Sequence, residues 1–162
     1  MEYISIPISF QPSEQGFNAR VERNIQECIT MMDNLVELIV FTPRGSFNAD
    51  PDFGFEYWNY EFINVSGKDF NTNVGLDEYS QQSAKERCET SIAENILAYV
   101  PEKLGISNVI VDMSMQDYKH KGVDLCRKVV IDVSAKFNGG TGTECNYNHK
   151  ISFMVEPQIR EI

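Results

Sequence analysis

The stretch Thr42-Pro43-Arg44-Gly45-Ser46-Phe47-Asn48-Ala49-Asp50-Pro51-Asp52-Phe53-Gly54 decides how the rest of the chain is arranged. A helical apolar pattern runs into it and stops, because Pro43 lacks a backbone donor and Gly45 accepts the positive φ found just past a helix end. Phe47 and Phe53 are large apolar groups that a solvated linker does not need. We therefore predict a structured loop packed by its own aromatic residues. The alternative is a plain helix stop followed by a surface turn.

Composition and charge narrow the class of protein. The 162 residues, of which 42% are hydrophobic and 23% charged, predict one globular domain spanning residues 1–162. The apolar runs are too short to cross a bilayer, and residues 1–10 alternate instead of forming a signal peptide, so we expect a cytoplasmic protein without membrane insertion. The net charge of −10 argues against nucleic acid as a partner.

No motif in the sequence marks catalytic chemistry. The four cysteines form no C-x-x-C pair, and no glycine-rich loop precedes a lysine as in phosphate-binding sites. His120 and His149 have no Cys or Ser partner at a recognisable spacing. Asp50, Asp52 and Glu56 cluster near the central loop, but an acidic chain supplies such groups by chance. We expect a protein that is not an enzyme, with no catalytic residue, metal, cofactor or small-molecule substrate.

The first part of the chain carries one strand pattern and one helix pattern. Residues 3–10 alternate between apolar and polar, which predicts a half-buried strand, and residues 11–16 read as a loop. Apolar residues then repeat at helical spacing from about Asn18 to Phe41, with Asn18 in the position of an N-cap. Asp33-Asn34 could divide this helix into two, although the apolar stripe keeps its phase across them.

The middle of the chain leads into a second helix. Residues 55–62 are aromatic and fit a short strand, a helical turn or an extended segment, and residues 63–76 read as a loop. The second helix should begin between Glu78 and Ser83 and end near Tyr99. Ser83 with Glu86 fits a capping box, although Asp77 or Ser80 could cap an earlier start, and Pro101 stops the helix. We also expect Phe47, Phe53 and Trp58 to be packed, because they would otherwise expose an apolar patch.

The last third reads as β structure and settles the fold class. Residues 108–115, 128–137 and 150–156 alternate, with loops expected at 116–127 and 138–147. Consecutive strands joined by loops form an antiparallel meander, and the two helices must cover its apolar face. We predict an α+β fold: a small, mostly antiparallel sheet with two main helices packed on one face.

The residues around the central loop resemble a known family. Residues 34–46, followed by Asp50-Pro51-Asp52-Phe53-Gly54, show a helix that ends in a Thr-x-x-Gly turn and leads into a Pro-x-Phe-Gly element. This pattern resembles the gene-25-like baseplate wedge family, which includes the wedge protein of contractile phage tails and the TssE protein of type VI secretion systems. The resemblance covers about residues 20–156. Its structural motif falls on Thr42, Arg44, Gly45, Pro51, Phe53 and Gly54.

One departure from the family pattern follows the second helix. The family carries an aromatic residue and then Glu-Pro-Arg, whereas this chain reads Tyr99-Val100-Pro101-Glu102-Lys103. Tyr99 and Pro101 match, but the acid and the base are displaced to Glu102 and Lys103, and Lys is a poorer bidentate partner than Arg. The resemblance implies a protein interface at these four residues. The displacement indicates a divergent type VI or related injection system.

The resemblance also implies a function. Members of the family are structural components of the baseplate wedge, bound to other wedge proteins, and they seed the contractile sheath, whose first ring adds its strands to the family's sheet. The implied partners are therefore sheath subunits and other baseplate wedge proteins. Two alternatives stay open: a stand-alone protein-binding regulator on the same fold, and a lysozyme-like enzyme that degrades peptidoglycan.

Overall fold

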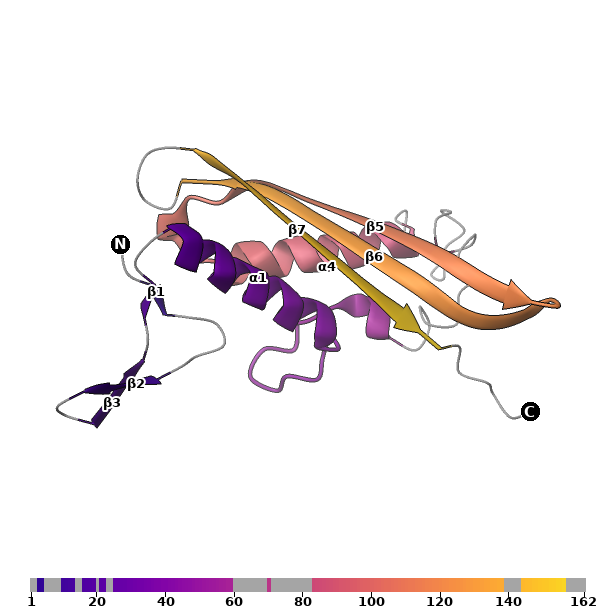
Figure 1. Cartoon of the computed structure of the whole chain (residues 1–162), viewed down its shortest axis with the longest axis horizontal. Helices are drawn as coiled ribbons and strands as arrows, with labels where there is room; N and C mark the ends of the chain where they lie inside the picture. The colour runs from indigo at the N-terminus through magenta and orange to yellow at the C-terminus, as the bar shows by residue number, and fades with distance from the viewer. Residues whose placement is uncertain are drawn as a thin grey trace.

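The computed structural model describes residues 3–4, 10–13, 16–19, 21–22, 25–59, 70, 83–138 and 144–156, with the backbone alone for those before 25 and for 103, 124 and 125. Its body is a three-stranded antiparallel sheet in the order β5-β6-β7 with two helices against one face (Figure 1). The predicted α+β fold class is confirmed. The strands are β5 (Ser107–His120), β6 (Val123–Phe137) and β7 (Cys145–Val155), and the helices are α1 (Ile25–Phe41) and α4 (Ala84–Tyr99).

Helix α1 is shorter at its start than its apolar pattern predicts. The described residues before it form β3 (Gly16–Ala19) and β4 (Val21–Glu22), so the expected start at Asn18, with that residue as N-cap, is wrong. Asn18 instead pairs with Gln11 in an antiparallel ladder. A single apolar residue such as Val21 fits a strand as well as a helix, and here the pairing between strands places it in a strand. No break occurs at Asp33-Asn34, because α1 is continuous.

The N-terminal strands also differ from the prediction. β1 (Tyr3–Ile4) pairs with β4, and β2 (Phe10–Ser13) pairs with β3, so residues 11–13 and 16 are strand where a loop was expected. Neither pair belongs to the three-stranded sheet. Residues 5–9, in the middle of the predicted first strand, lie outside the described residues, as do most of the loop expected at 63–76 and the region before Ser83. The aromatic cluster forms a helical turn, η1 (Glu56–Trp58).

Helix α4 begins and ends where the sequence predicts. The Ser83 hydroxyl accepts a hydrogen bond from the Glu86 N–H at 3.2 Å, and the Glu86 carboxylate accepts one from the Ser83 N–H at 3.0 Å, which completes the capping box. After Tyr99 the chain turns through η2 (Glu102–Leu104) to Gly105, which has φ of +59°. The positive φ favours glycine at Gly105, and a Cβ there would also force the Asn138 side chain, 2.5 Å away, to move.

The strand alternation is confirmed, although the strands are longer than expected. Met113, Ile131 and Ile151 sit side by side in the ladder and are buried toward the helices. The loop expected at 116–127 is wrong: β5 and β6 continue to a two-residue turn at Lys121 (φ +51°) and Gly122 (φ +81°). The polar residues there belong to a hairpin end that extends past the third strand. β7 likewise begins at Cys145, within the other expected loop.

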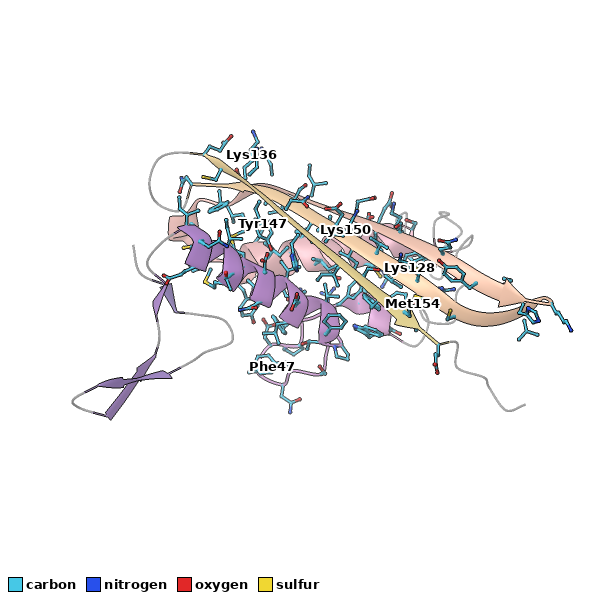
Figure 2. The ribbon with its side chains drawn as sticks, viewed as in Figure 1. Phe47, Lys128, Lys136, Tyr147, Lys150 and Met154 are labelled. Carbon is cyan, nitrogen blue, oxygen red and sulfur yellow. The ribbon has the colours of Figure 1, made fainter. Side chains whose placement is uncertain are left out.

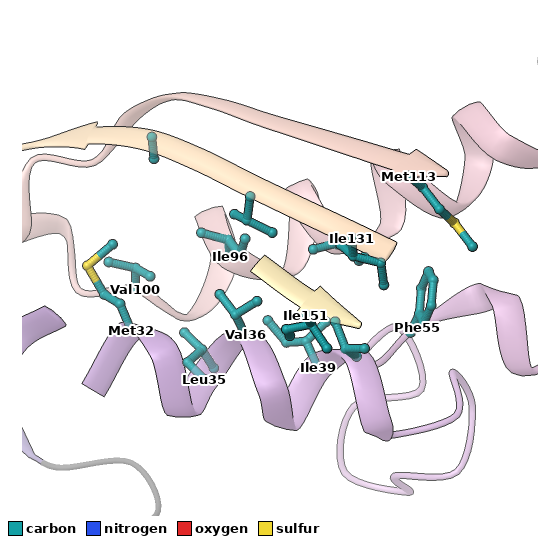
Figure 3. Packing of buried hydrophobic residues seen from close by; sticks show 14 of the residues in the cluster. Met32, Leu35, Val36, Ile39, Phe55, Ile96, Val100, Met113, Ile131 and Ile151 are labelled. Atoms are coloured by element: carbon teal, nitrogen blue, oxygen red, sulfur yellow. The ribbon is translucent and has the colours of Figure 1, made fainter. Parts of the chain in front are cut away.

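The core lies between the sheet and the helices, with α4 along β5 and α1 along β7 (Figures 1 and 3). From the sheet it receives Val129, Ile131 and Val133 of the central strand, which have no measurable exposure. Cys28 and Cys88 are buried on the helices, as expected for small apolar groups, and burial raises the pKa of the Cys88 thiol. The buried apolar residues of the two helices are Cys28, Met31, Met32, Leu35, Val36, Ile39, Val40, Ala84, Cys88, Ile92 and Ile96.

The state of the cysteines gives a first prediction. Cys28, Cys88, Cys126 and Cys145 form no disulfide. Alkylation of the unfolded, unreduced protein should therefore modify all four, as counted by mass spectrometry. Alkylation of the native protein should spare Cys28 and Cys88, because reagent cannot reach them and a raised pKa leaves little thiolate at Cys88. Fewer than four modifications in the freshly unfolded protein would contradict the thiol assignment.

Candidate functional site

The central loop is closed on itself at its base. The Phe55 N–H donates to the Thr42 carbonyl at 2.8 Å, and the Arg44 N–H donates to the Phe55 carbonyl at 3.3 Å, so the two ends of the loop run side by side. Two of the carbonyls that end α1 accept hydrogen bonds from side chains. The Thr42 hydroxyl donates to Leu38 O and the Trp58 indole N–H to Val40 O, each at 2.6 Å. The predicted structured loop is confirmed.

Gly54 is the position in the loop where only glycine fits. Its φ is +113°, and a Cβ there would lie 2.5 Å from the Thr42 carbonyl oxygen and 3.0 Å from the Arg44 nitrogen. Within the loop, the N–H groups of Asp50 and Phe53 donate to Phe47 O and Asp50 O at 3.1 Å, which forms two successive turns. The Pro-x-Phe-Gly element therefore brings the backbone back against the end of α1.

Asn95 of α4 holds this returning backbone in place. Its side-chain oxygen accepts the Gly54 N–H at 3.1 Å, and its amide donates to Asp52 O at 3.2 Å. Asn95 is only 5% exposed, so these bonds satisfy groups that water does not reach. Sequence reasoning did not select Asn95. The available signal was an amide at position 95, between the buried Ile92 and Ile96 of the apolar stripe.

The aromatic residues of the loop divide into packed and exposed ones. Phe53 is 7% exposed and makes edge contacts with Tyr99 at 5.0 Å and with Phe47 at 5.9 Å between ring centroids. Trp58 is half-buried and stacks on Phe153 of β7 at 5.4 Å. Phe47 is 49% exposed, so the expectation that it is packed is wrong: it lies at the outer end of the loop, where only Phe53 covers one side (Figure 2).

Arg44 organises the charges beside the loop. Its guanidinium lies 3.1 Å from Asp52 and 3.5 Å from Glu56, and Glu56 also pairs with Arg87 of α4 at 2.5 Å. Arg44 separates two surface hollows, one of about 390 Å³ beside Glu56 and Arg87 and one of about 150 Å³ beside Asp52 and Tyr99. The carboxylates near the loop are thus engaged in ion pairs or hydrogen bonds, and these contacts fix the loop on α4.

The structure brings Tyr99, one of the four predicted interface residues, onto the loop. Its hydroxyl donates to the Asp50 carboxylate, and this hydrogen bond raises the pKa of Tyr99. Pro101 precedes η2 and is half-buried, while Glu102 is exposed on it. The side chain of Lys103 lies outside the described part, so its relation to Glu102 is not placed. Tyr99 and residues of the central loop therefore form one surface, which we call the loop surface: Arg44, Phe47, Asp50, Asp52 and Tyr99, with the buried ring of Phe53 beneath it.

A second polar cluster joins α1 to β7, and sequence reasoning missed it. The Tyr147 hydroxyl donates to Asp33 at 2.8 Å, and burial raises the pKa of Tyr147. His149 Nδ1 lies 3.3 Å from Asp33 Oδ1, and His149 Nε2 lies 3.4 Å from Glu37 Oε1. The sequence placed His149 beside a loop, whereas it lies within β7 on the face toward α1. The signal was its odd-numbered place in the alternation with Ile151 and Phe153.

Neither a metal site nor a membrane-spanning helix is found in the described part of the chain. There, no group of three His, Cys, Asp or Glu side chains converges as metal ligands do. No helix in that part combines the length and hydropathy needed to cross a membrane. His120 ends β5 and is exposed. Compared with known proteins, the chain matches no protein-family model and no curated protein.

The aromatic packing predicts unequal effects of two alanine substitutions. Phe53→Ala should lower the free energy of unfolding by about 3–5 kcal/mol, because it removes a buried ring between Phe47 and Tyr99. Phe47→Ala is the matched control and should change it by about 0.5 kcal/mol or less, since half of that ring is exposed. Urea unfolding measures both, and equal effects would contradict the packing described.

The Asn95 clamp predicts a local opening of the loop. Asn95→Ala leaves the Gly54 N–H without its partner and should cost about 1–3 kcal/mol. Because the loop then detaches more often, trypsin should cleave after Arg44 faster under native conditions. Glu94→Ala changes the neighbouring exposed helix position and should leave cleavage unchanged. Similar cleavage rates for both variants and the wild type would show that Asn95 does not hold the loop.

Proposed function

We propose that the chain is a structural baseplate wedge component of a contractile injection machine, of the type VI or a phage-tail-like class. It links the wedge to the sheath and seeds sheath assembly by accepting a strand. The proposal joins the resemblance in residues 34–54 to two surfaces of the structure: the loop surface on α4, and the outer edge of β7. Other wedge proteins would bind the first and sheath subunits the second.

The observation that carries the proposal is the state of the β7 edge. β7 pairs with β6 in an unbroken register from Cys145 to Val155, with no bulge, and its sequence contains no proline. Among the described residues, only β6 pairs with it. Proteins usually protect edge strands with bulges, prolines or covering elements, and an edge without them is a template for strand addition.

The opposite edge of the sheet is less suited to strand addition. The Met113 N–H of β5 donates to the Glu89 carboxylate of α4 at 2.7 Å, and Lys85 of α4 pairs with Asp112 at 3.1 Å. The β5 register also shifts twice, between Ser107 and Ile110 and between Tyr118 and Lys119. Helix α4 and these irregularities protect β5, so β7 is the edge that we assign to the sheath.

The loop surface supports the wedge contact. It is held to α4 by Asn95, and it still exposes the ring of Phe47 and part of Tyr99. Large aromatic groups on a rigid element are the residues that most often anchor protein interfaces. Pro101 and Glu102 come just after Tyr99 in the chain, separated from it only by Val100, so the turn implied by the resemblance continues this surface.

Sheath assembly tests the proposal. In a strain that lacks this chain and carries a fluorescent sheath subunit, the wild type should restore sheaths seen by microscopy. Glu102→Ala with Lys103→Ala should fold normally, because an exposed charge such as that of Glu102 adds about 1 kcal/mol at most, yet fail to restore them. Gln116→Ala with Lys128→Ala, a cross-strand pair on the outer sheet face, is the control and should restore sheaths. Failure of the wild type itself would reject the function.

A further inference from the structure

The edge of β7 with which no described strand pairs is bordered by one flank of helix α1. Asp33 and Glu37 reach Tyr147 and His149, and Phe41 makes an edge contact with Phe153 at 5.4 Å. These α1 residues are spaced four positions apart and so share one helix flank. Glu37 is 53% exposed and Phe41 is 52% exposed, so the flank is accessible beside the strand. Any strand added to β7 would place its inward side chains along it.

The flank differs in chemistry from one end to the other. At the His149 position it presents the carboxylates of Asp33 and Glu37. At the Phe153 position it presents the ring of Phe41, which contacts Phe153, as does the ring of Trp58 in η1. His149 and Phe153 are four residues apart on the same face of β7, with Ile151 between them. The acidic end and the aromatic end of the flank therefore lie four residues apart along β7.

We propose that β7 selects its incoming strand by this pattern: a Lys or Arg and, four residues away on the same face, a large apolar residue, with an apolar residue between them. The cation would lie against Asp33 and Glu37, and the apolar side chain would cover Phe41 and Phe153. Residues on the other face of the added strand would be polar, like Lys150 of β7, which points away from the helices (Figure 2). This inference rests on the proposed strand addition and names the strand that it accepts.

A second copy of this chain fits the edge less well than a basic partner strand. Two copies, each with a net charge of −10, would repel one another. A two-fold pairing of β7 with itself would also place the Asp33 and Glu37 carboxylates of both copies in one short interface, where they would repel one another. The charge of the flank instead complements a cationic segment of another protein.

Peptide binding tests the pattern. The probe is a fluorescent peptide with Arg, Val and Leu at alternate positions and Thr between them, and its affinity is read by polarisation. Replacing Arg by Glu should weaken binding about tenfold, since an attraction becomes a repulsion. Moving Arg to a neighbouring Thr position should weaken it roughly threefold to fivefold. Slower amide exchange in residues 145–155, and not in 84–99, should locate the peptide on β7.

Variants of the flank check the assignment. Glu37→Gln should reduce the preference for Arg over Glu, and Phe41→Ala should weaken the Arg peptide about fivefold to tenfold. Glu94→Gln and Leu97→Ala are matched controls on α4, where Leu97 is 55% exposed, and should have no effect. Equal affinity for the Arg and Glu peptides, or no binding of either, would overturn the pattern.

The outcomes also separate the pattern from the function on which it rests. If sheath subunits slow exchange in residues 145–155 while the peptides do not discriminate, strand addition stands and the pattern is wrong. If sheath subunits leave this exchange unchanged, strand addition itself is wrong, and the pattern is overturned with it. A concentration-dependent dimer in sedimentation, with β7 protected, would assign the edge to a second copy and reject the basic partner.

Discussion

The side-chain amide of Asn95 holds together the region where the two helices and the central loop meet. The loop returns its backbone to the end of α1 at Gly54, where the N–H and C=O groups are shielded from water. Buried backbone groups require partners, and one amide supplies both a donor and an acceptor to them. Phe53 can then lie under Tyr99, and Arg44 can reach both Asp52 and Glu56. Without this clamp the loop would detach from α4 more often.

Trp58 connects the loop to the sheet edge. Its indole N–H bonds to Val40 at the end of α1, and its ring stacks on Phe153 of β7 at 5.4 Å. The same phenylalanine contacts Phe41. The end of α1, the turn after the loop and the open strand are therefore packed against one another. A partner bound at the loop surface therefore contacts residues that are packed against the β7 edge, and a partner bound at the β7 edge contacts residues packed against the loop.

The features predicted from sequence are those decided by neighbours in the chain. The Ser83 capping box involves residues three apart, and the alternation in β6 follows from burial of one face. The predicted start of α1 was wrong because Val21 fits both the strand period and the helix period. Its pairing with a strand distant in the sequence placed it in β4. The prediction of a loop at 116–127 was wrong because this hairpin end lies beyond the core, where strands can consist of polar residues. There the Asp117–Arg127 pair joins the two strands at 2.6 Å.

Within the site, the turn residues Thr42 and Gly54 and the burial of Phe53 could be read from local chemistry. Asn95 could not, because its partner Gly54 is 41 residues away. The prediction that Phe47 is packed was wrong for a different reason. Its hydrophobicity predicts burial, but its place at the outer end of the loop leaves it exposed. The acidic flank beside β7 depends on how α1 lies against the sheet, and the periodicity of the sequence does not predict that packing.

The unbroken register of β7 has a mechanical consequence. A strand paired along all of Cys145–Val155 and pulled along its own axis is loaded in shear, so its ladder hydrogen bonds share the force and must break together. A strand pulled from one end, at right angles to the sheet, would lose them one at a time. A bulge in β7 would concentrate the load at one point. The straight edge is therefore suited to transmit tension along the strand direction into the core beneath it.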